Sequence, residues 1–315
     1  MGKADRGRLG LGNVHGYVSS PLEVNVPRSA VPIASASCGE AHSLVLGKNG
    51  VLMACGDNRY GQCDPSLGSG YFECMQEVHV NQMASRSTGP NSASWSQPGL
   101  HVGCRLSCIA AGSYVSAAVT QDDSPHYSSL ILWGKDVPTA PLEPPHPHAS
   151  SPAAYGWHAG LEHSIERIAL AADESLFLQD NRYCIWQYHW MRSLETEAIA
   201  PSPSSLPHQT TIRHPPLAQS GEREGELPLW AVAESNLWIC RRPTQWEWNG
   251  HQVSRRSIAC RMQAAYSGRM HFVGIGDCQQ GPIIALDAQT LDVCDRWELP
   301  VGADSFGGVD AIVLC

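Results

Sequence analysis

The sequence predicts an all-β protein made of many short strands joined by tight turns. Only 16% of its residues are charged, whereas soluble domains typically contain about 25%. The chain also contains 29 glycines and 22 prolines, which favour turns over long helices. Short apolar runs recur along the whole chain, and most are followed by a polar turn signal. Together these observations favour a repeated β architecture.

The clearest unit is a predicted β-hairpin in residues 37–57. Its two apolar runs flank Asn49 and Gly50, which both tolerate the positive φ that a two-residue hairpin turn requires. Gly268 and His271 repeat the Gly-x-x-His spacing of Gly39 and His42. Weaker copies of the hairpin lie at residues 111–135, 171–186 and 229–240. Hairpins that recur in this way along one chain predict a single β-propeller domain over residues 1–315.

Each end of the chain carries half of such a unit. The segment that starts at Gly308 reads as a first strand, with residues 312–314 as its inner strand, whereas residues 7–13 read as the loop after a second strand. We therefore expect the two termini to complete the last blade, because ring closure removes exposed sheet edges. The strand expected before Gly7 is missing from this pattern.

Segments of turn-forming composition interrupt the repeats near residues 81–101, 136–158 and 195–228. They are rich in Ser, Asn and Pro and have little apolar periodicity, which is typical of loops. Repeat units recur on both sides of each segment, so we interpret them as loop insertions on one propeller face. Linkers between separate domains are the alternative.

Charge and hydropathy exclude several classes of protein. The net charge is −9, and the largest basic clusters are the Arg pairs 241–242 and 255–256, so direct DNA binding is not expected. No apolar run approaches the roughly 18 residues of a membrane span, and the N-terminus does not resemble a signal peptide. Twelve Cys spread over the whole chain fit a reduced compartment. We therefore expect a cytoplasmic and nuclear protein without membrane association.

The repeats resemble those of the regulator of chromosome condensation family. The resemblance rests on residues 7–13, 37–46 and 56–62. It implies seven blades of about 45 residues each. The residues that match structural positions of the repeat are Gly39, His42, Gly56, Asp57, Asn58, Gly61, Gly268, His271 and Gly308.

A narrower resemblance rests on Cys55, which stands before Gly56 where most such repeats have Trp. Residues 306–308, followed by the apolar residues 312–314, and the chain length point the same way. These features look like the fungal alpha-tubulin suppressor, or killer-toxin-insensitivity, propellers. That resemblance implies a non-catalytic partner of the small zinc-binding electron carrier of diphthamide synthesis. Through the same carrier it implies a link to Elongator-dependent modification of the tRNA wobble uridine.

Signatures of catalysis and of cofactor binding are missing from the sequence. It contains no nucleophile elbow, P-loop or dinucleotide fingerprint, so we expect neither an enzyme nor a bound cofactor. His101, Cys104 and Cys108 have metal-ligand spacing but lack an evident fourth ligand, so no metal site is predicted. His42 and His271 could act as ligands or bases, but a repeated position favours repeated packing.

The preferred partner-binding residues are Trp246 and Trp248, together with Arg241 and Arg242. Trp and Arg are enriched at interface hot spots, and these residues alternate with polar ones. Core packing between blades is the other interpretation of the Trp residues. We expect a monomer or a heterodimer with the carrier. The competing hypotheses are nucleotide exchange on a Ran-like small GTPase and docking of an unrelated partner such as tubulin.

Overall fold

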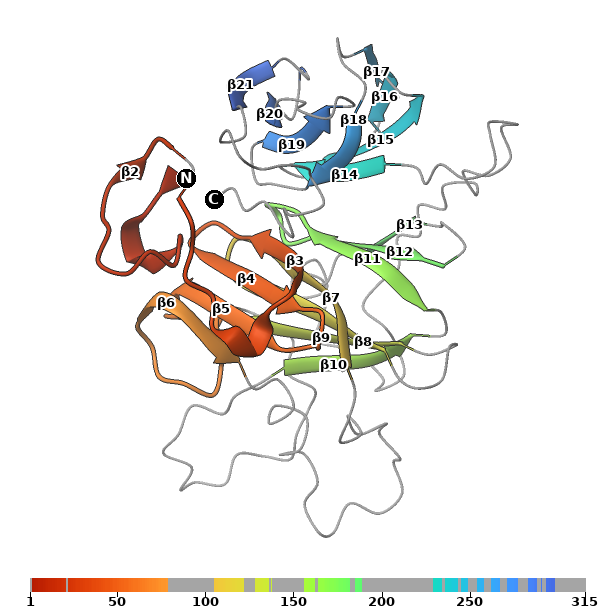
Figure 1. Cartoon of the computed structure of the whole chain (residues 1–315). Helices are drawn as coiled ribbons and strands as arrows, with labels where there is room; N and C mark the ends of the chain where they lie inside the picture. Colours follow the sequence, from red (N-terminus) through yellow and green to blue (C-terminus); the bar gives the residue numbers. More distant parts are fainter. Residues whose placement is uncertain are drawn as a thin grey trace, which may run out of the picture.

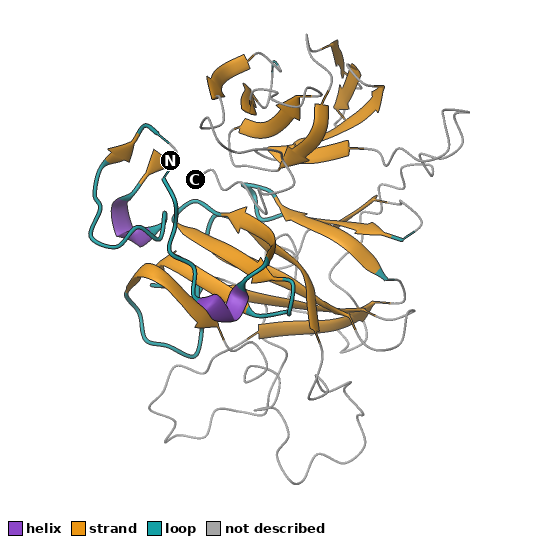
Figure 2. Ribbon diagram, in the orientation of Figure 1, coloured by secondary structure: helices purple, strands orange, loops and turns teal. Residues whose placement is uncertain are grey.

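The fold is seen in a computed structural model, drawn in Figure 1 and coloured by secondary structure in Figure 2. The structure describes residues 2–20, 22–78, 105–121, 128–135, 137, 156–161, 164–181, 185–188, 229–233, 236–242, 245–248, 254–257, 262–266, 271–276, 283–287, 290 and 293–297. Most of these residues lie in β-strands. The exceptions include the short 3-10 turns η1 (Asp5–Gly7) and η2 (Arg28–Ala30).

The strands form antiparallel sheets whose members follow one another in chain order. Blade 1 is β3 (Ile33–Cys38), β4 (His42–Gly47), β5 (Leu52–Asp57) and β6 (Tyr71–Val78). Blade 2 is β7 (Arg105–Ala111), β8 (Val115–Gln121), β9 (Ser128–Gly134) and β10 (Gly156–Leu161). Blade 3 contains β11 (Ile165–Leu170), β12 (Leu176–Asp180) and β13 (Ile185–Tyr188).

Blade 4 is β14 (Leu229–Ala233), β15 (Asn236–Arg242), β16 (Gln245–Trp248) and β17 (Ser254–Ser257). Blade 5 is β18 (Met262–Tyr266), β19 (His271–Gly276), β20 (Ile283–Asp287) and β21 (Val293–Trp297). A two-stranded pair, β1 (Gly2–Lys3) and β2 (Tyr17–Val18), precedes them and is called the N-terminal half-blade.

The first strands of the blades contact one another in order. β3 contacts β7, β7 contacts β11, β11 contacts β14, and β14 contacts β18. Sheets that pack through successive inner strands are arranged radially, as Figure 1 shows for the blades around a common centre. The predicted all-β propeller is therefore confirmed. The number of seven blades stays a prediction, and residues 308–314 lie outside the described part of the chain.

Apolar side chains fill the space between neighbouring blades. One cluster joins Leu44 and Phe72 of blade 1 to Ile109 and Trp133 of blade 2. A second joins blade 2 to Ile168 and Leu178 of blade 3, and a third packs blade 3 against Trp230 of blade 4. Blades 2 and 3 thus each contribute to two of these cores, so neither buries its apolar faces alone.

The hairpin of β4 and β5 forms as predicted, but its turn has a different geometry. The Gly47 N–H donates to Val51 O, and the Gly50 N–H donates to Gly47 O. This is a three-residue loop closed by Gly50 at φ 84°, with Asn49 outside the positive-φ region. The expected two-residue turn was wrong. A loop with one more residue needs only one residue with positive φ to close the hairpin, and Gly50 provides it.

The N-terminal half-blade copies the second half of blade 1. In it Gly2 and Lys3 pair with Val18 and Tyr17, in the same register as Gly56 and Asp57 with Phe72 and Tyr71. The first glycine has φ 115° in the half-blade and 110° in blade 1. The strand that the sequence pattern lacked before Gly7 is therefore present as β1. It escaped notice because it has only two residues.

The predicted loop insertions fall mostly on segments that are not described. Residues 81–101 and 195–228 lie outside the described residues. The insertion predicted at 136–158 ends earlier than expected, because strand β10 begins at Gly156 and pairs with β9. Its glycine and aromatic residues complete blade 2 as an outer strand rather than extending the loop.

Gly56 offers a direct test of the repeat geometry. An added Cβ there would overlap the carbonyl oxygen of Ala41, and φ is 110°. We expect Gly56→Ala to destabilise the fold by more than about 2 kcal/mol. Gly68→Ala is the matched control, since a Cβ there meets no atom within 4 Å. Thermal unfolding checks both variants, and equal melting temperatures for the two would contradict the assignment.

Candidate functional site

A repeated hydrogen-bond arrangement joins consecutive blades, and we call it the inter-blade latch. The carbonyl oxygen of Gln62, in the loop after β5, accepts the Ser116 hydroxyl at 2.7 Å. It also accepts the indole N–H of Trp133 at 2.9 Å. All of these residues are fully buried, so both bonds act away from solvent. The latch fixes the loop of blade 1 on the strands of blade 2.

The same latch recurs one step earlier in the ring. The carbonyl oxygen of Arg8 accepts the Ser43 hydroxyl at 2.6 Å and faces the Cys55 thiol at 3.6 Å. Arg8 follows Gly7 as Gln62 follows Gly61, and both glycines have φ near 75°. Cys55 therefore occupies the position of Trp133, and a weak thiol donor replaces an indole.

His42 completes the latch between blades 1 and 2. Its Nε2 lies 2.8 Å from the Ser116 oxygen. Because the Ser116 hydroxyl hydrogen is donated to Gln62, His42 must donate from Nε2 and carry no proton on Nδ1. Nδ1 has no hydrogen-bond partner, and burial lowers the pKa of His42 to about 4. The side chain is thus a neutral, fully buried donor.

The turns between the first and second strands of blades 1, 2 and 3 lie against one another. The Glu40 N–H donates to Gly112 O at 3.2 Å. In the next step, the Tyr114 N–H donates to Glu174 Oε1 at 2.8 Å, and the Ser113 hydroxyl donates to Ala172 O at 3.0 Å. These hydrogen bonds hold the turns of blades 1, 2 and 3 in fixed positions relative to one another.

Glu174 is a strained and buried member of this turn series. It has φ 62°, its side chain is buried, and Oε2 has no hydrogen-bond partner. Burial raises its pKa to about 7, against the opposing hydrogen bonds from Tyr114 and Ser113. Because the folded-state pKa is raised, this carboxyl favours folding most below pH 4.5, and the contribution is lost as the pH rises through 7.

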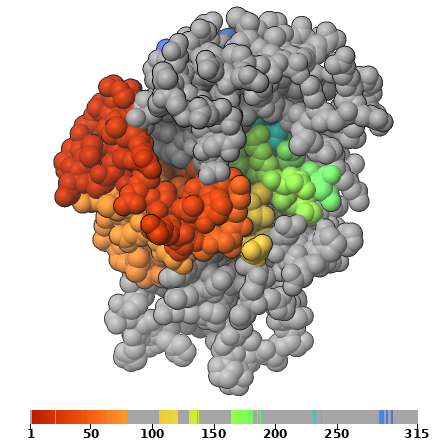
Figure 3. Space-filling view, in the orientation of Figure 1, coloured from red at the N-terminus to blue at the C-terminus, as the bar shows by residue number. Residues whose placement is uncertain are grey.

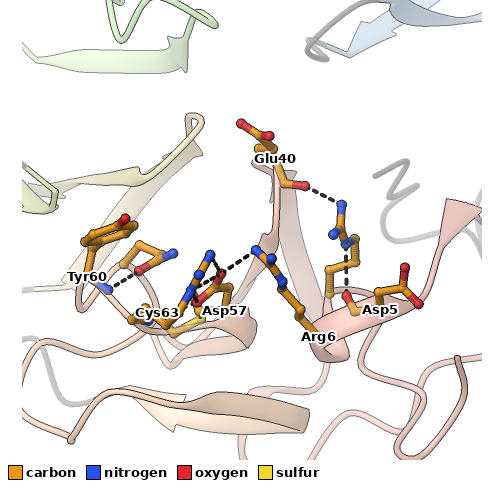
Figure 4. A network of polar contacts seen from close by, with 9 residues as sticks. Asp5, Arg6, Glu40, Asp57, Tyr60 and Cys63 are labelled. Carbon is orange, nitrogen blue, oxygen red and sulfur yellow. Dashed lines mark hydrogen bonds and ion pairs between the residues drawn. The ribbon is translucent and has the colours of Figure 1, made fainter.

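Charged side chains converge beside the latch, as Figure 4 shows. The Asp57 carboxylate is fully buried and pairs with Arg6 at 3.1 Å and with Arg59 at 2.7 Å. Burial opposes ionisation of Asp57, but the Arg59 hydrogen bonds and the two positive charges outweigh it and lower the Asp57 pKa. The Arg6 and Arg59 side chains are 41% and 40% exposed, so they present charge at the surface.

Two tyrosines and a lysine adjoin this ion pair. The Tyr60 and Tyr114 rings meet edge to face with centroids 5.4 Å apart. Lys135 Nζ lies 5.2 Å from the Tyr60 centroid and 5.5 Å from that of Tyr114. Arg59 approaches the Tyr60 ring at 5.9 Å. We call Arg6, Arg59, Tyr60, Tyr114 and Lys135 the cationic–aromatic patch.

The N-terminal repeat positions named from the sequence lie in and around this region. Gly39 packs against the carbonyl of Gly112, and Gly61 lies in the loop after β5. The Asn58 amide shapes that loop, because Oδ1 accepts the N–H groups of Cys63 and Asp64 and Nδ2 donates to Asp64 O. In the C-terminal half, Gly268 and Gly308 lie outside the described residues, whereas His271 begins β19.

The predicted partner-binding residues lie on another blade. Arg241 and Arg242 end β15, and Trp246 and Trp248 lie on β16. These strands pair through Arg242 with Gln245 and Cys240 with Trp246, so the four residues share one sheet. Their contribution to partner binding stays a prediction.

The cationic–aromatic patch itself was not predicted. Its sequence signal is an Arg-Tyr dipeptide two residues after Asp57, inside a loop that the glycine at 61 bounds. Nothing in the sequence places Tyr114 and Lys135 beside Tyr60, because these residues belong to different blades.

Among the described residues, no group of His, Cys, Asp and Glu is arranged to hold a metal ion. Cys108, from the trio with metal-ligand spacing, lies in β7 with its thiol 3.1 Å from Glu166 O, and burial raises its pKa to about 11. His101 and Cys104 lie outside the described part. Within that part, no helix is long and apolar enough to span a membrane.

Comparison with protein families identifies the repeats. Residues 1–46 and 33–62 match models of the regulator of chromosome condensation (RCC1) repeat. Residues 1–62 are therefore similar to the RCC1 repeat. The matched segments contain the N-terminal half-blade, the inter-blade latch through Arg8, and the loop up to Gln62. They support the resemblance to the RCC1-repeat family.

Solved structures agree with this architecture. Prp20p from Saccharomyces cerevisiae, described with its binding to Gsp1p and histones, matches with a TM-score of 0.53 and 14% identity over 95% of this chain and 73% of that one. Yeast RCC1 (Prp20) bound to Kap60 matches with a TM-score of 0.51 and 14% identity, over 95% and 71% of the two chains. At this identity the likeness shows the fold alone. No curated protein matches the chain.

The neutral state of His42 predicts a specific pH dependence. Its folded-state pKa is lowered from 6.5 to about 4, so stability is fully present above pH 6.5 and is lost as the pH falls toward 4. Between pH 6.5 and pH 4, the free energy of unfolding of the wild type should fall by about 3 kcal/mol more than that of His42→Gln. Urea unfolding at both pH values measures this difference. His15→Gln, which changes an exposed histidine, should behave as the wild type; identical pH profiles for all three proteins would contradict the assignment.

Proposed function

We propose that this chain is a non-catalytic protein-interaction scaffold. The observation that carries the proposal is the combination of the inter-blade latch with an exposed cationic–aromatic patch directly beside it. A surface held by buried hydrogen bonds loses little conformational entropy when a partner binds. Arg and Tyr, which contribute most of the described patch, are enriched at protein-interaction hot spots.

In the part of the chain that the structure describes, several groups of a type that can support catalysis serve the fold instead. His42 and Ser116 are hydrogen-bonded like a base and a nucleophile, but both are fully buried and the hydroxyl is committed to Gln62 O. The thiols of Cys63 and Cys108 are buried, which raises their pKa values and disfavours the reactive thiolate. This use of reactive side chains as packing elements supports a non-catalytic role.

For the partner, we propose the small zinc-binding electron carrier of diphthamide synthesis. The support is the sequence resemblance at residues 55–58 and 306–314 to the alpha-tubulin suppressor propellers. Cys55, the distinguishing residue, lies in the latch of the half-blade. Through the carrier the chain would support Elongator-dependent modification of the tRNA wobble uridine, in the cytoplasm and nucleus.

Nucleotide exchange on a Ran-like GTPase is the alternative. The specific observation in its favour is the fold likeness to Prp20p, which is described as binding Gsp1p. A nucleotide-release assay with a Ran-like GTPase decides between the two: acceleration by this chain would replace the carrier hypothesis.

Co-purification tests the proposed partner. The tagged full-length chain, isolated from its native host, should bring down a small zinc protein in about stoichiometric amount. Deletion of the gene should reduce diphthamide on elongation factor 2. A purified chain without the carrier, together with normal diphthamide after deletion, would overturn the proposal.

A further inference from the structure

We propose that Asn49 is a site of spontaneous deamidation, and that the aspartate it forms releases η2 from blade 1. This inference is independent of the proposed partner. Asn49 is exposed and precedes Gly50 in the turn between β4 and β5. The η2 turn, purple in Figure 2, contacts β4 and leads into β3, the first strand of blade 1. Figure 3 shows residues of the half-blade and blade 1, coloured red to orange, on the surface of the molecule.

An asparagine followed by glycine carries the reacting groups of deamidation within one dipeptide. The Gly50 nitrogen forms a bond to Cγ of Asn49, the Cγ–Nδ2 bond breaks, and Nδ2 leaves as ammonia with the proton from Gly50 N. Water then opens the resulting imide ring at one of its two carbonyl groups, which gives aspartate or isoaspartate. Glycine has no side chain to hinder the attack, and the exposure of Asn49 admits the water.

In the folded turn, each of these reacting groups is held by a hydrogen bond. Asn49 Nδ2 donates to Ser29 O in η2, and Asn49 Oδ1 accepts the Val51 N–H at 3.2 Å. The attacking Gly50 N–H donates to Gly47 O at 2.9 Å. The ring therefore closes only after these bonds break. The rate of deamidation thus depends on how often the turn opens and separates from η2.

The product cannot restore the contact with η2. A carboxylate only accepts hydrogen bonds, so an aspartate at this position would face the Ser29 carbonyl oxygen with a second acceptor. Isoaspartate also adds a carbon atom to the main chain of a three-residue loop, which disturbs its closing bonds. The conversion is irreversible, so each opening that leads to reaction permanently weakens the contact.

The released segment supports the core of blade 1. Ala30 of η2 is fully buried in a cluster with Val45 and Met53. A backbone bond also joins the two segments, because the Lys48 N–H donates to Pro32 O at 2.8 Å. Loss of the Asn49 bond therefore weakens the junction at which the chain from the half-blade enters blade 1.

Peptide mass spectrometry of the full-length chain, incubated in mildly alkaline buffer, measures the rate of conversion at Asn49. The folded wild type should convert about tenfold more slowly than the same chain in urea, which corresponds to an opening free energy of about 1.4 kcal/mol. Conversion only in urea, or at equal rates in both conditions, would overturn the inference.

A matched pair of variants tests the dependence on η2. Ala30→Gly removes the buried methyl group of η2 and leaves Asn49 and Gly50 unchanged. It should accelerate folded-state conversion about fivefold. Ala169→Gly makes the same change at a buried residue of β11 in blade 3, and it should convert as the wild type does. Circular dichroism confirms that both variants fold, and equal rates in the two would contradict the dependence.

Hydrogen exchange tests the effect of the product. Asn49→Asp reproduces the aspartate, and Asn13→Asp makes the same change of charge at another exposed asparagine. Exchange at the Ala30 and Lys48 amides should be about fivefold faster in Asn49→Asp, because one hydrogen bond to η2 is lost. Asn13→Asp should exchange as the wild type does. Unchanged exchange in Asn49→Asp, or equal acceleration in both variants, would overturn the release of η2.

Discussion

The architecture depends on one backbone carbonyl that accepts two side-chain donors from the next blade. At Gln62 the donors are the Ser116 hydroxyl and the Trp133 indole, and all of them are buried. An unsatisfied buried carbonyl costs about 1–3 kcal/mol, so the loop after β5 is held to the position in which both donors reach it. Since that loop also carries Arg59 and Tyr60 and begins directly after Asp57, the same constraint orders the charged surface.

The copy of this arrangement at Arg8 shows how the repeats tolerate sequence change. The Ser43 hydroxyl keeps its short bond, but Cys55 replaces the indole and faces the carbonyl at 3.6 Å. The joint between the half-blade and blade 1 therefore has one strong donor instead of two. Additional contacts compensate, because the Arg8 guanidinium binds Glu40 O and Arg6 pairs with Asp57. Buried hydrogen bonds and a partly exposed ion pair thus both attach the half-blade to blade 1.

The sequence predicted what depends on local chemistry. Alternating apolar runs and Gly-containing turns identified the hairpins of blades 1 to 4. Position 56 requires glycine because its φ is 110°, and this glycine helped to make the repeat recognisable. Features that depend on contacts between blades were not predictable. Ser116 and Gln62 are 54 residues apart, and Tyr60 and Tyr114 meet only because two blades pack together. The β1 strand was missed because two residues carry no periodicity.

Hydrogen exchange at the amides of the loop after β5 measures whether the inter-blade latch orders this surface. Trp133→Phe removes one donor to Gln62 O and keeps an aromatic side chain, whereas Trp230→Phe makes the same change and removes a comparable bond to Gln179 Oε1 in another blade. We expect faster exchange at Cys63 and Asp64 in Trp133→Phe alone, with β4 and β5 still protected. Unchanged exchange in that variant, or equal acceleration in both, would contradict the claim that the latch orders this surface.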